Sequence, residues 1–524
     1  MNCFRVVLPV VFFLLFSLVP LAHAIETRGA SELYQLHCAQ CHHPDRVGAM
    51  GPALMAESLA RFSKKEAAEV IAKGRPATQM PPFEQHLSPE EIQSLVTLIY
   101  TPLSTPPNWS EGAIKESYIV HHPLDSLSKK PLHAADIMNL FMVVELGDHH
   151  ITVLDGDRLE PLHRFPSRFA VHGGIKYSPD GRFAYMASRD GWISQFDLYT
   201  LQMTSEIRVG INTRNMAVSG DGRFVMVANA LPRNLVVLDA KDLSLVKIIQ
   251  TVNKKGESAL PSAVYAAPPR HTFVVGFKDL AEIWEIPYND QAKPIYTATV
   301  HDFQPASGED LPVAKGPFPI RHIELDTILD DFFFDQAYHH LIGASRSGLS
   351  GRVVNLNVGR KIAEIDIAGM PHLASGITWP YKDTVVMASP NLKEGEVTIV
   401  DLKTWKTIKR IKTMGPGFFM RSHENTPYAW VDVFFGPDKD AVHVIDKATL
   451  EIVKTLRPAP GKTSAHVEFT KDGRYALLSI WEMDGAVVVY DGKTLEEVKR
   501  IPMKKPSGKY NVSNKINRSA GTSH

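Results

Sequence analysis

The most specific chemical signal in this 524-residue sequence is a Cys-x-x-Cys-His motif formed by Cys38, Cys41 and His42. The two cysteines of such a motif hold the edge of a porphyrin through thioether bonds, and the histidine binds its iron. The motif therefore predicts one covalently attached c-type haem, with His42 as an iron ligand. A single haem of this kind would accept one electron at a time.

Four residues further along the chain could form a second reactive site. His172, His372 and His466 each lie in a short segment beside apolar strands, and Tyr510 lies in the stretch SGKYNVSNK. Two glycines follow His172 and would let a large flat ligand come close to the backbone. The chain has 22 histidines, and a buried, hydrogen-bonded histidine is common, so one such residue alone indicates little. The group becomes informative only if the fold brings its members together.

A repeat after residue 135 predicts a fold that would do so. Each unit has an apolar strand, a few turn residues, a second apolar strand with an acidic or amide residue at its end, and a polar turn. The units recur about every 42–46 residues, with one longer interval, which is the period of four-stranded propeller blades. The eight end positions are Asp155, Asp197, Asp239, Glu285, Asn357, Asp401, Asp446 and Asp491. They predict an all-β, eight-bladed propeller, in which histidines on loops between blades converge on one face of the ring.

Two further segments complete the predicted ring. The long interval fits an inserted loop at residues 289–316, which would lie over one face. The stretch KYNVSNKI, residues 509–516, is expected to close the ring against the first blade. The propeller is therefore predicted to extend over residues 136–524.

The haem motif lies in a separate all-α domain, expected at residues 25–105. An amphipathic helix carries the motif, a Gly/Pro loop follows it, and Ser88-Pro89-Glu90-Glu91 begins a capped helix with apolar residues at helical spacing. This order resembles a class I cytochrome c, and the resemblance implies Met80, in QMPPF, as the sixth iron ligand. A thioether ligand raises the reduction potential and so suits electron acceptance. The other candidates for this ligand are Met50, Met55, His43 and His86.

Two segments outside the predicted domains indicate a targeting signal and a linker. Residues 1–24 have an apolar run that ends in Ala22-His23-Ala24, which indicates a signal peptide with removal after Ala24; an uncleaved membrane anchor is the alternative. Removal would leave a bacterial periplasmic protein with no membrane span. Residues 106–135 are expected to act as a linker. Equal numbers of basic and acidic residues, 57 each, give no electrostatic argument for nucleic acid as a partner.

Over its full length the propeller resembles the haem d1 domain of cytochrome cd1 nitrite reductases, which also have a cytochrome c domain in front. The stretch FAVH places His172 where that family has the axial histidine of haem d1. ASRDGWI and VGINTRNMAVS place Arg189 and Arg214 where arginines surround the carboxylates of the macrocycle, and guanidinium groups bind carboxylates in pairs of hydrogen bonds. The resemblance implies haem d1, or its dihydro precursor, as a ligand of the ring.

Longer runs resemble the dihydro-haem d1 dehydrogenases of this family more closely. These runs are PFPIRHIELDTILDDFFF, GPGFFMRSHENTPYAWVDVFFGP, PGKTSAHVEF and KPSGKYNVSNKI. The second contains Arg421, which is expected to contact the macrocycle as well. The reductases use two distal histidines to hold and protonate nitrite. His372 matches one of them, but the matching point for the other falls near Leu329, with His339 and His340 some ten residues on.

The resemblance implies an oxidoreductase of the last step of haem d1 biosynthesis, which converts a propionate of dihydro-haem d1 to an acrylate. That reaction removes two electrons and two protons from adjacent carbons. His372 is the first candidate for the base, and His466 and Tyr510 are expected to orient the side chain or relay the second proton.

The haem c would pass the electrons to an external acceptor such as a small c-type cytochrome. The nitrite reductase and other haem d1 biosynthesis proteins are the remaining expected partners. Three alternatives remain: a cytochrome cd1-type nitrite reductase, a carrier that delivers haem d1 to the reductase without chemistry, and a cytochrome fused to a propeller for a quinone cofactor.

Overall fold

The structure is a computed structural model. It describes residues 29–49, 51–59, 62–74, 80–105, 107–169, 171, 174–296, 313–314, 316–329, 331–344, 350–367, 369–518 and 521. The expected signal peptide, Met50, His172 and most of the expected insertion at 289–316 lie outside the described residues. In the part of the chain that is described, no helix is long and apolar enough to cross a membrane.

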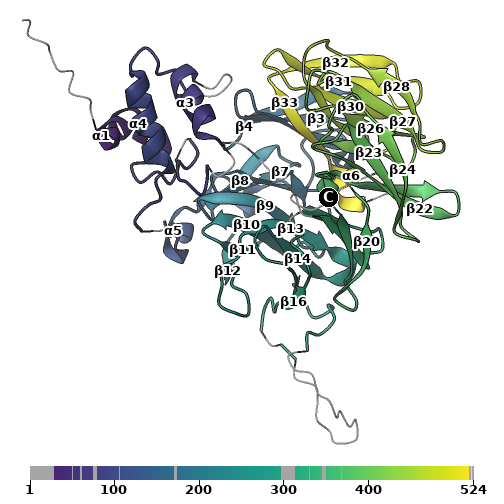
Figure 1. Cartoon of the computed structure of the whole chain (residues 1–524), viewed down its shortest axis with the longest axis horizontal. Coiled ribbons are helices and arrows are strands. Elements are labelled where there is room, and N and C mark those ends of the chain that lie inside the picture. Colours follow the sequence, from purple (N-terminus) through teal and green to yellow (C-terminus); the bar gives the residue numbers. More distant parts are fainter. Residues whose placement is uncertain are drawn as a thin grey trace, which may run out of the picture.

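Four helices form the N-terminal domain, which lies beside the strands of the rest of the chain (Figure 1). They are α1 (Ala30–His37), α2 (Ala39–His42), α3 (Lys64–Lys73) and α4 (Pro89–Tyr100). A capping box begins α4, in which the Ser88 hydroxyl accepts from the Glu91 N–H and the Glu91 side chain accepts from the Ser88 N–H. The apolar stripe of α4 then packs against α1 and α3. This start and this stripe follow the sequence prediction.

The remaining strands form eight sheets, one for each predicted blade, around a central channel. From the innermost strand outward, the first blade contains β33 (Pro506–Asn511), β2 (Leu140–Glu145), β3 (His150–Asp155) and β4 (Glu160–Pro166). The second contains β5 (Lys176–Tyr177), β6 (Phe183–Ala187), β7 (Trp192–Asp197) and β8 (Gln202–Arg208). The third contains β9 (Asn212–Val218), β10 (Phe224–Leu231), β11 (Asn234–Asp239) and β12 (Leu245–Gln250), and the fourth contains β13 (Pro261–Ala267), β14 (Thr272–Phe277), β15 (Glu282–Pro287) and β16 (Arg321–Glu324).

The other four blades have the same order. The fifth blade contains β17 (Asp331–Phe334), β18 (His340–Ala344), β19 (Gly351–Asn355) and β20 (Arg360–Ile365). The sixth contains β21 (Ile377–Tyr381), β22 (Thr384–Pro390), β23 (Glu396–Asp401) and β24 (Lys406–Lys412). The seventh contains β25 (Met420–Ser422), β26 (Tyr428–Asp432), β27 (Val442–Asp446) and β28 (Ile452–Leu456), and the eighth contains β29 (Ser464–Phe469), β30 (Tyr475–Ile480), β31 (Gly485–Asp491) and β32 (Glu497–Met503). The predicted fold class, a helical cytochrome c domain followed by an eight-bladed propeller, is confirmed.

The repeated aspartate has a structural role at the end of the third strand of a blade. Asp401 Oδ1 accepts from the N–H groups of Lys403 (2.7 Å) and Thr404 (2.9 Å) in the turn that follows. The turn closes when Trp405, with φ 58°, donates its N–H to the Asp401 carbonyl. In the fifth blade Asn355, and not Asn357, takes this position, because its Oδ1 accepts from the N–H of residue 357.

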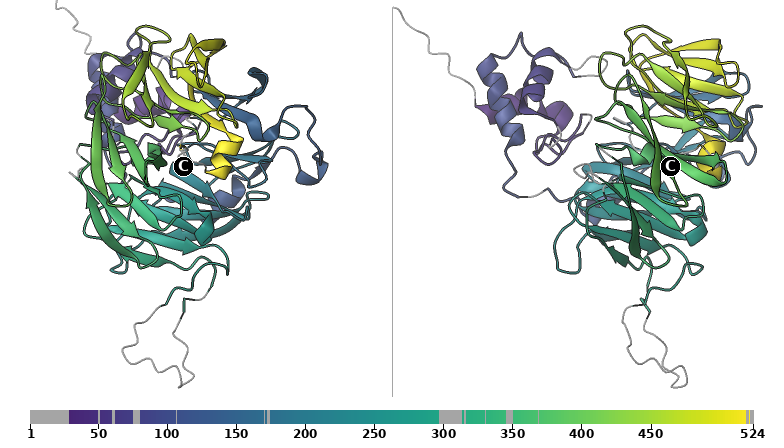
Figure 2. Two further views of the ribbon diagram at one scale, coloured as in Figure 1. Left: turned by 90° about the vertical axis from the view of Figure 1, so that its right-hand side faces the viewer. Right: turned by 45° about the vertical axis from the view of Figure 1, so that its right-hand side comes forward.

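The C-terminal strand closes the ring. β33 pairs antiparallel with β2, with Tyr510 beside Met142, as the sequence predicted. Only the first part of the stretch KYNVSNKI is strand, however, because α6 (Val512–Asn517) follows at once with Asn511 as its N-cap. α6 lies on the inner side of the ring (Figure 2), where the Asn514 amide donates to Glu468 Oε1 of the eighth blade at 3.0 Å.

The range expected as a linker, 106–135, has structure of its own. It contains α5 (Glu111–Glu116), β1 (Ile119–Val120) and the short helix η1 (Leu124–Ser126), and η2 (Ile137–Asn139) follows. β1 adds a fifth strand to the second blade by pairing with β8. Two more short helices, η3 (Pro268–Arg270) and η5 (Leu373–Ser375), lie between propeller strands.

Candidate functional site

The haem motif lies where α1 meets α2. Cys38 and Cys41 are both free thiols, and His42 is the buried last residue of α2. Because the Pro52 carbonyl can only accept, His42 Nδ1 donates to it at 2.7 Å, and the lone pair is on Nε2, the nitrogen that an iron would take. Gly51 leaves room beside the ring, since a Cβ there would lie 2.6 Å from His42 Cε1. These residues fit a covalent c-type haem.

The candidates for the sixth iron ligand differ in their surroundings. Met80 is partly buried against the helical core. Met55 is buried in a different cluster, where it packs with Ile211 of the propeller. His86 is exposed, and His43 accepts a hydrogen bond from a backbone N–H through Nδ1. Met80 therefore stays the prediction for this ligand.

The loop after the haem motif contacts the propeller through one arginine. Arg208, the last residue of β8, donates from Nη2 to the Val47 carbonyl at 2.7 Å and from Nη1 to the Gly48 carbonyl at 3.2 Å. Its guanidinium also lies 4.5 Å from the centre of the Trp109 ring. In each blade the outermost strand ends at the mouth of the channel where the innermost strand of the next blade begins. Arg208 ends the outermost strand of its blade, so the haem loop that it contacts lies at that mouth.

Three of the predicted residues come together inside the ring. His372 precedes β21, His466 lies on β29 and Tyr510 on β33, and the Phe419 ring connects them. Ring centres are 6.2 Å apart for His372 and Phe419, 4.7 Å for Phe419 and His466, and 5.5 Å for His466 and Tyr510. His172 lies outside the described residues. Gly174, two positions on, faces the cluster, since a Cβ there would lie 3.1 Å from Tyr510 Cε1.

The two histidines have opposite tautomers. His372 Nδ1 donates to the Phe418 carbonyl at 2.6 Å, which puts the lone pair on Nε2. His466 Nδ1 instead accepts from the Lys509 N–H at 3.4 Å, so its proton is on Nε2. Burial, helped by the charge of Lys509, holds the pKa of His466 well below its ordinary value. Burial also raises the pKa of Tyr510 to about 12, so its hydroxyl stays a donor.

The sequence reasoning missed a carboxylate that ties these loops together. Asp432 is 1% exposed, and its Oδ1 accepts from the N–H groups of Phe418 (2.8 Å) and Phe419 (3.1 Å). Its Oδ2 accepts from the His466 N–H at 3.2 Å. One side chain thus anchors the backbone beside His372 and the backbone of His466. The sequence feature that could have identified Asp432 is an aspartate within the apolar run AWVDVFF.

The three predicted arginines lie on different blades. Arg189 is in the turn after β6, and its carbonyl accepts from the Thr213 N–H, which brings it beside Arg214 on β9. Arg421, on β25, is buried, and its Nε lies 3.6 Å from Glu468 Oε2. The charge of Arg421 is therefore balanced by a carboxylate of the protein itself.

The residues near the expected second distal histidine do not supply one. Leu329 is fully buried in the core between two blades. His339 and His340 follow β17 and so lie towards the mouth opposite His372, where His340 Nδ1 is 2.7 Å from Asp335 Oδ2. The described chain thus offers only His372 from the expected pair.

Comparisons with known proteins identify families that match each part of the chain. A family model described as "Cytochrome D1 heme domain" matches residues 135–305 and 314–515, and one described as "Cytochrome C oxidase, cbb3-type, subunit III" matches residues 26–99. The nitrite reductase of Stutzerimonas stutzeri is 23% identical over 94% of this chain and 94% of its own length.

Two closer matches share one name. The "Dihydro-heme d1 dehydrogenase" of Pseudomonas aeruginosa is 51% identical over 504 residues, which are 96% of this chain and 97% of that protein. The solved structure "Dihydro-heme d1 dehydrogenase NirN in complex with DHE" is 50% identical, covers 93% of this chain and 99% of its own, and superposes with a TM-score of 0.85. The chain therefore belongs to the cytochrome d1 haem domain family, and within it to the group of the dihydro-haem d1 dehydrogenases.

Proposed function

We propose that this protein is a periplasmic dihydro-haem d1 dehydrogenase that oxidises a propionate side chain of its substrate to an acrylate, the last step of haem d1 biosynthesis. The observation that carries the proposal is the likeness, over nearly the full length, to a relative named for that activity. The signal peptide predicted at residues 1–24 supports the compartment. The substrate would bind reversibly at the mouth of the channel, with His172, Arg189, Arg214 and Arg421 as its proposed contacts.

The proposed chemistry divides the work among three side chains. His372 takes the two protons from the adjacent carbons in turn through Nε2, because its Nδ1 is bound to a carbonyl, and it releases the first to solvent before it takes the second. Tyr510, with its raised pKa, keeps its proton and donates a hydrogen bond to the side chain that reacts. The low pKa of His466 argues against a second base, and supports an orienting role through its Nε2–H.

The two electrons would leave through one c-type haem, held by Cys38, Cys41 and His42 with Met80 as the proposed sixth ligand. That haem supplies one-electron acceptance at a raised potential. The protein contributes a fixed imidazole orientation, through the bond from His42 to Pro52, and a contact between the haem loop and the propeller, through Arg208. An external acceptor such as a small c-type cytochrome would then collect the electrons in two steps. Nitrite reductase and other biosynthesis proteins are the proposed recipients and suppliers of the macrocycle.

Two other functions predict different results. A nitrite reductase would need the second distal histidine, and Leu329 is buried in the core instead. A carrier would bind the macrocycle without changing it. The test is to mix the purified protein with dihydro-haem d1 anaerobically, add an electron acceptor and follow the visible spectrum. Conversion to the acrylate form is expected, and binding without conversion would favour the carrier.

A further inference from the structure

The backbone of His466 has a conformation that is unusual inside a strand. Its φ is 58°, in the left-handed region, which residues other than glycine adopt at an energetic cost. Trp405 has the same conformation in a turn between strands, but His466 is 3% exposed and lies within β29. Such a backbone persists only where the surrounding structure holds it in place. The contacts of His466 therefore show what restrains it.

A β-bulge accounts for the conformation of His466. The pairing of β29 with β30 shifts between Ala465 and Glu468, so His466 and Val467 together stand opposite Leu478. In one class of bulge the first of the two residues has a left-handed backbone, and that residue is ordinarily glycine. Bulges next to active sites change the direction of a side chain. This bulge thus directs the imidazole into the proposed site, at a cost in backbone energy.

Lys509 bonds to the residue that the bulge strains. Its Nζ donates to the His466 carbonyl and, at 2.7 Å, to Ser479 Oγ, and its backbone N–H donates to His466 Nδ1 at 3.4 Å. The Ser479 hydroxyl donates to the Ser507 carbonyl at 3.0 Å, which leaves its oxygen to accept from Lys509. Asp432 accepts from the His466 N–H. The N–H, the carbonyl and the ring of His466 are therefore all bonded, and Lys509 supplies two of these three contacts.

A buried ammonium group is a costly way to supply one of these bonds. Lys509 is fully buried, and burial lowers the pKa of its amine to about 7. The carboxylates of Glu468 and Asp432 favour the charged form of the amine. An apolar side chain would fill the same space without the cost of burying a charge. The presence of an amine indicates that the bond to the His466 carbonyl matters.

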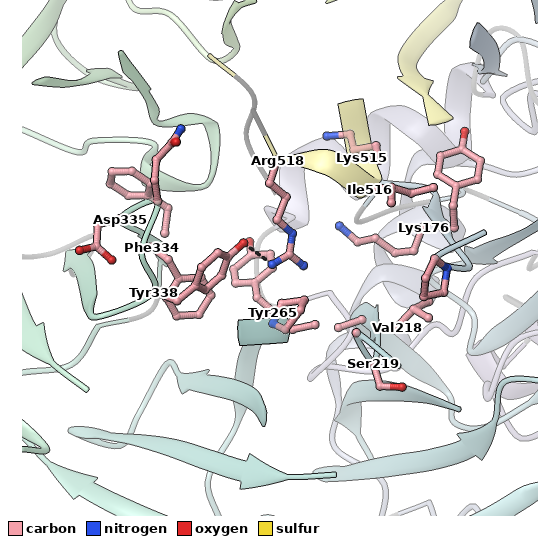
Figure 3. Close-up of a pocket in the computed structure, with 18 of the residues that line it drawn as sticks. Lys176, Val218, Ser219, Tyr265, Phe334, Asp335, Tyr338, Lys515, Ile516 and Arg518 are labelled. Atoms are coloured by element: carbon pink, nitrogen blue, oxygen red, sulfur yellow. Dashed lines mark hydrogen bonds between the residues drawn. The ribbon is translucent and has the colours of Figure 1, made fainter. Parts of the chain in front are cut away.

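Two other lysines near the site are placed differently from Lys509. Lys176 and Lys515 line a cavity of about 190 Å³ (Figure 3), and Lys515 Nζ lies 5.5 Å from the centre of the Tyr510 ring. Water or a ligand can reach the side chains that line such a cavity. Lys509 does not line it, and its amine bonds to a backbone carbonyl and a serine hydroxyl instead. The charge of Lys509 is therefore directed at the protein and not at a ligand.

We propose that Lys509 is a positioning residue for the dehydrogenase reaction, which holds His466 in its left-handed bulge so that Nε2–H is directed at the substrate side chain that reacts. The inference rests on the proposed function and extends it. The bond from Nζ fixes the peptide that follows His466, and the bond from the backbone N–H fixes the rotation of the ring. Lys509 precedes Tyr510 in β33, and neighbouring side chains of a strand point to opposite faces. Lys509 therefore acts through His466.

The first test is Lys509→Met, which keeps the length of the side chain and removes the donor. Single-turnover formation of the acrylate is expected to slow by about 10–100-fold, the worth of a hydrogen bond from a charged group. The affinity for dihydro-haem d1, measured by titration, is expected to stay the same. The matched control is Lys447→Met, which removes a lysine whose Nζ donates to the His423 carbonyl at 3.0 Å, and it is expected to react like the unchanged protein. Circular dichroism checks that each variant is folded.

The second test repeats Lys509→Met in a His466→Gly protein, in which glycine adopts the left-handed backbone without strain and the imidazole is absent. There Lys509→Met is expected to slow acrylate formation no further, and to lower the midpoint of thermal unfolding by less than it does beside His466. An equal loss of rate in both backgrounds, an equal loss in the midpoint, or an unchanged rate in Lys509→Met alone would overturn the proposal.

Folding and the proposed function are tested in the same series. A Lys509→Met protein that folds only together with His466→Gly would support the restraint, and one that folds in neither background would assign Lys509 to the core and overturn the proposal. If the unchanged protein binds dihydro-haem d1 and forms no acrylate, the proposed function fails. The unfolding midpoints need no substrate, so they still test whether Lys509 restrains His466.

Discussion

At the scale of single residues, hydrogen bonds to the backbone decide what each histidine can do. His42 and His372 both donate through Nδ1 to a carbonyl, so each directs the lone pair on Nε2 away from the backbone. His466 accepts through Nδ1 and is held neutral. The sequence identifies these residue types and the family resemblance suggests their roles. The tautomers depend on Pro52, Phe418 and Lys509, whose positions no local pattern reveals.

Replacement of His372 by Gln is expected to slow acrylate formation by about 10²–10⁴-fold, because the proposed base is lost. Binding of dihydro-haem d1, followed by its visible spectrum, is expected to continue. Single-turnover mixing measures the rate. The control is His340→Gln, at the other mouth, which is expected to react like the unchanged protein. An unaffected rate in His372→Gln would show that another group removes the proton.

Tyr510→Phe is expected to slow the reaction by about 10–100-fold, the worth of a hydrogen bond to a charged group. Since the pKa of Tyr510 is about 12, its hydroxyl keeps its proton up to about pH 10. Deprotonation of Tyr510 should therefore not lower the rate between pH 7 and pH 10. Rates measured from pH 7 to 10 check this. Tyr490→Phe, in another buried position, is the control. A loss of rate below pH 10 that disappears in Tyr510→Phe contradicts the donor role.

At the scale of elements, patterns within one blade are visible in the sequence and contacts between blades are not. The aspartate that ends the third strand and the capping box of Ser88 use bonds to residues two to four positions away, so their spacing predicts them. β1 could not be predicted in the same way, because a strand of two residues depends on the edge of β8. The role of Asp432 could not be predicted either, because its side chain bonds backbone groups of loops and strands in the sixth to eighth blades, which are separated in the sequence.

Asp432→Asn is expected to lower the free energy of unfolding by about 1–3 kcal/mol, because an amide cannot accept the bonds on both of its sides. The rate is expected to fall as well, since the loops of His372 and His466 lose their shared anchor. The diagnostic comparison is the double variant with His372→Gln. If Asp432 acts by positioning His372, the double variant reacts about as slowly as His372→Gln alone. A further additive loss of rate would assign Asp432 a separate role.

At the scale of the whole molecule, the haem loop and His372, the proposed base, lie at the same mouth of the propeller. The sequence predicts two domains and their order, and the helical domain and eight blades follow it. The contact that joins them depends on Arg208, which reaches carbonyls of residues 47 and 48 across more than 150 positions of chain. Carbonyl acceptors have no side-chain signature, so the sequence does not identify this contact.

Arg208→Gln is expected to slow reduction of the haem c by substrate at least about tenfold, because the haem loop loses two hydrogen bonds that fix it to the propeller. Substrate affinity is expected to stay the same, since Arg208 lies outside the proposed binding residues. Stopped-flow absorbance of the haem measures the first quantity and titration the second. Arg233→Gln, at an exposed ion pair with Asp279, is the control. Unchanged haem reduction would show that the domains need no such contact.

The central claim is that electrons from the macrocycle leave through the haem of the helical domain. It is tested most directly by anaerobic turnover of dihydro-haem d1 with an excess of oxidised acceptor, while haem c absorbance, acrylate product and reduced acceptor are recorded together. The account predicts that haem c is reduced before the acceptor, and that two electrons reach the acceptor for each acrylate formed. Acrylate formation at the full rate while haem c stays oxidised throughout would contradict it.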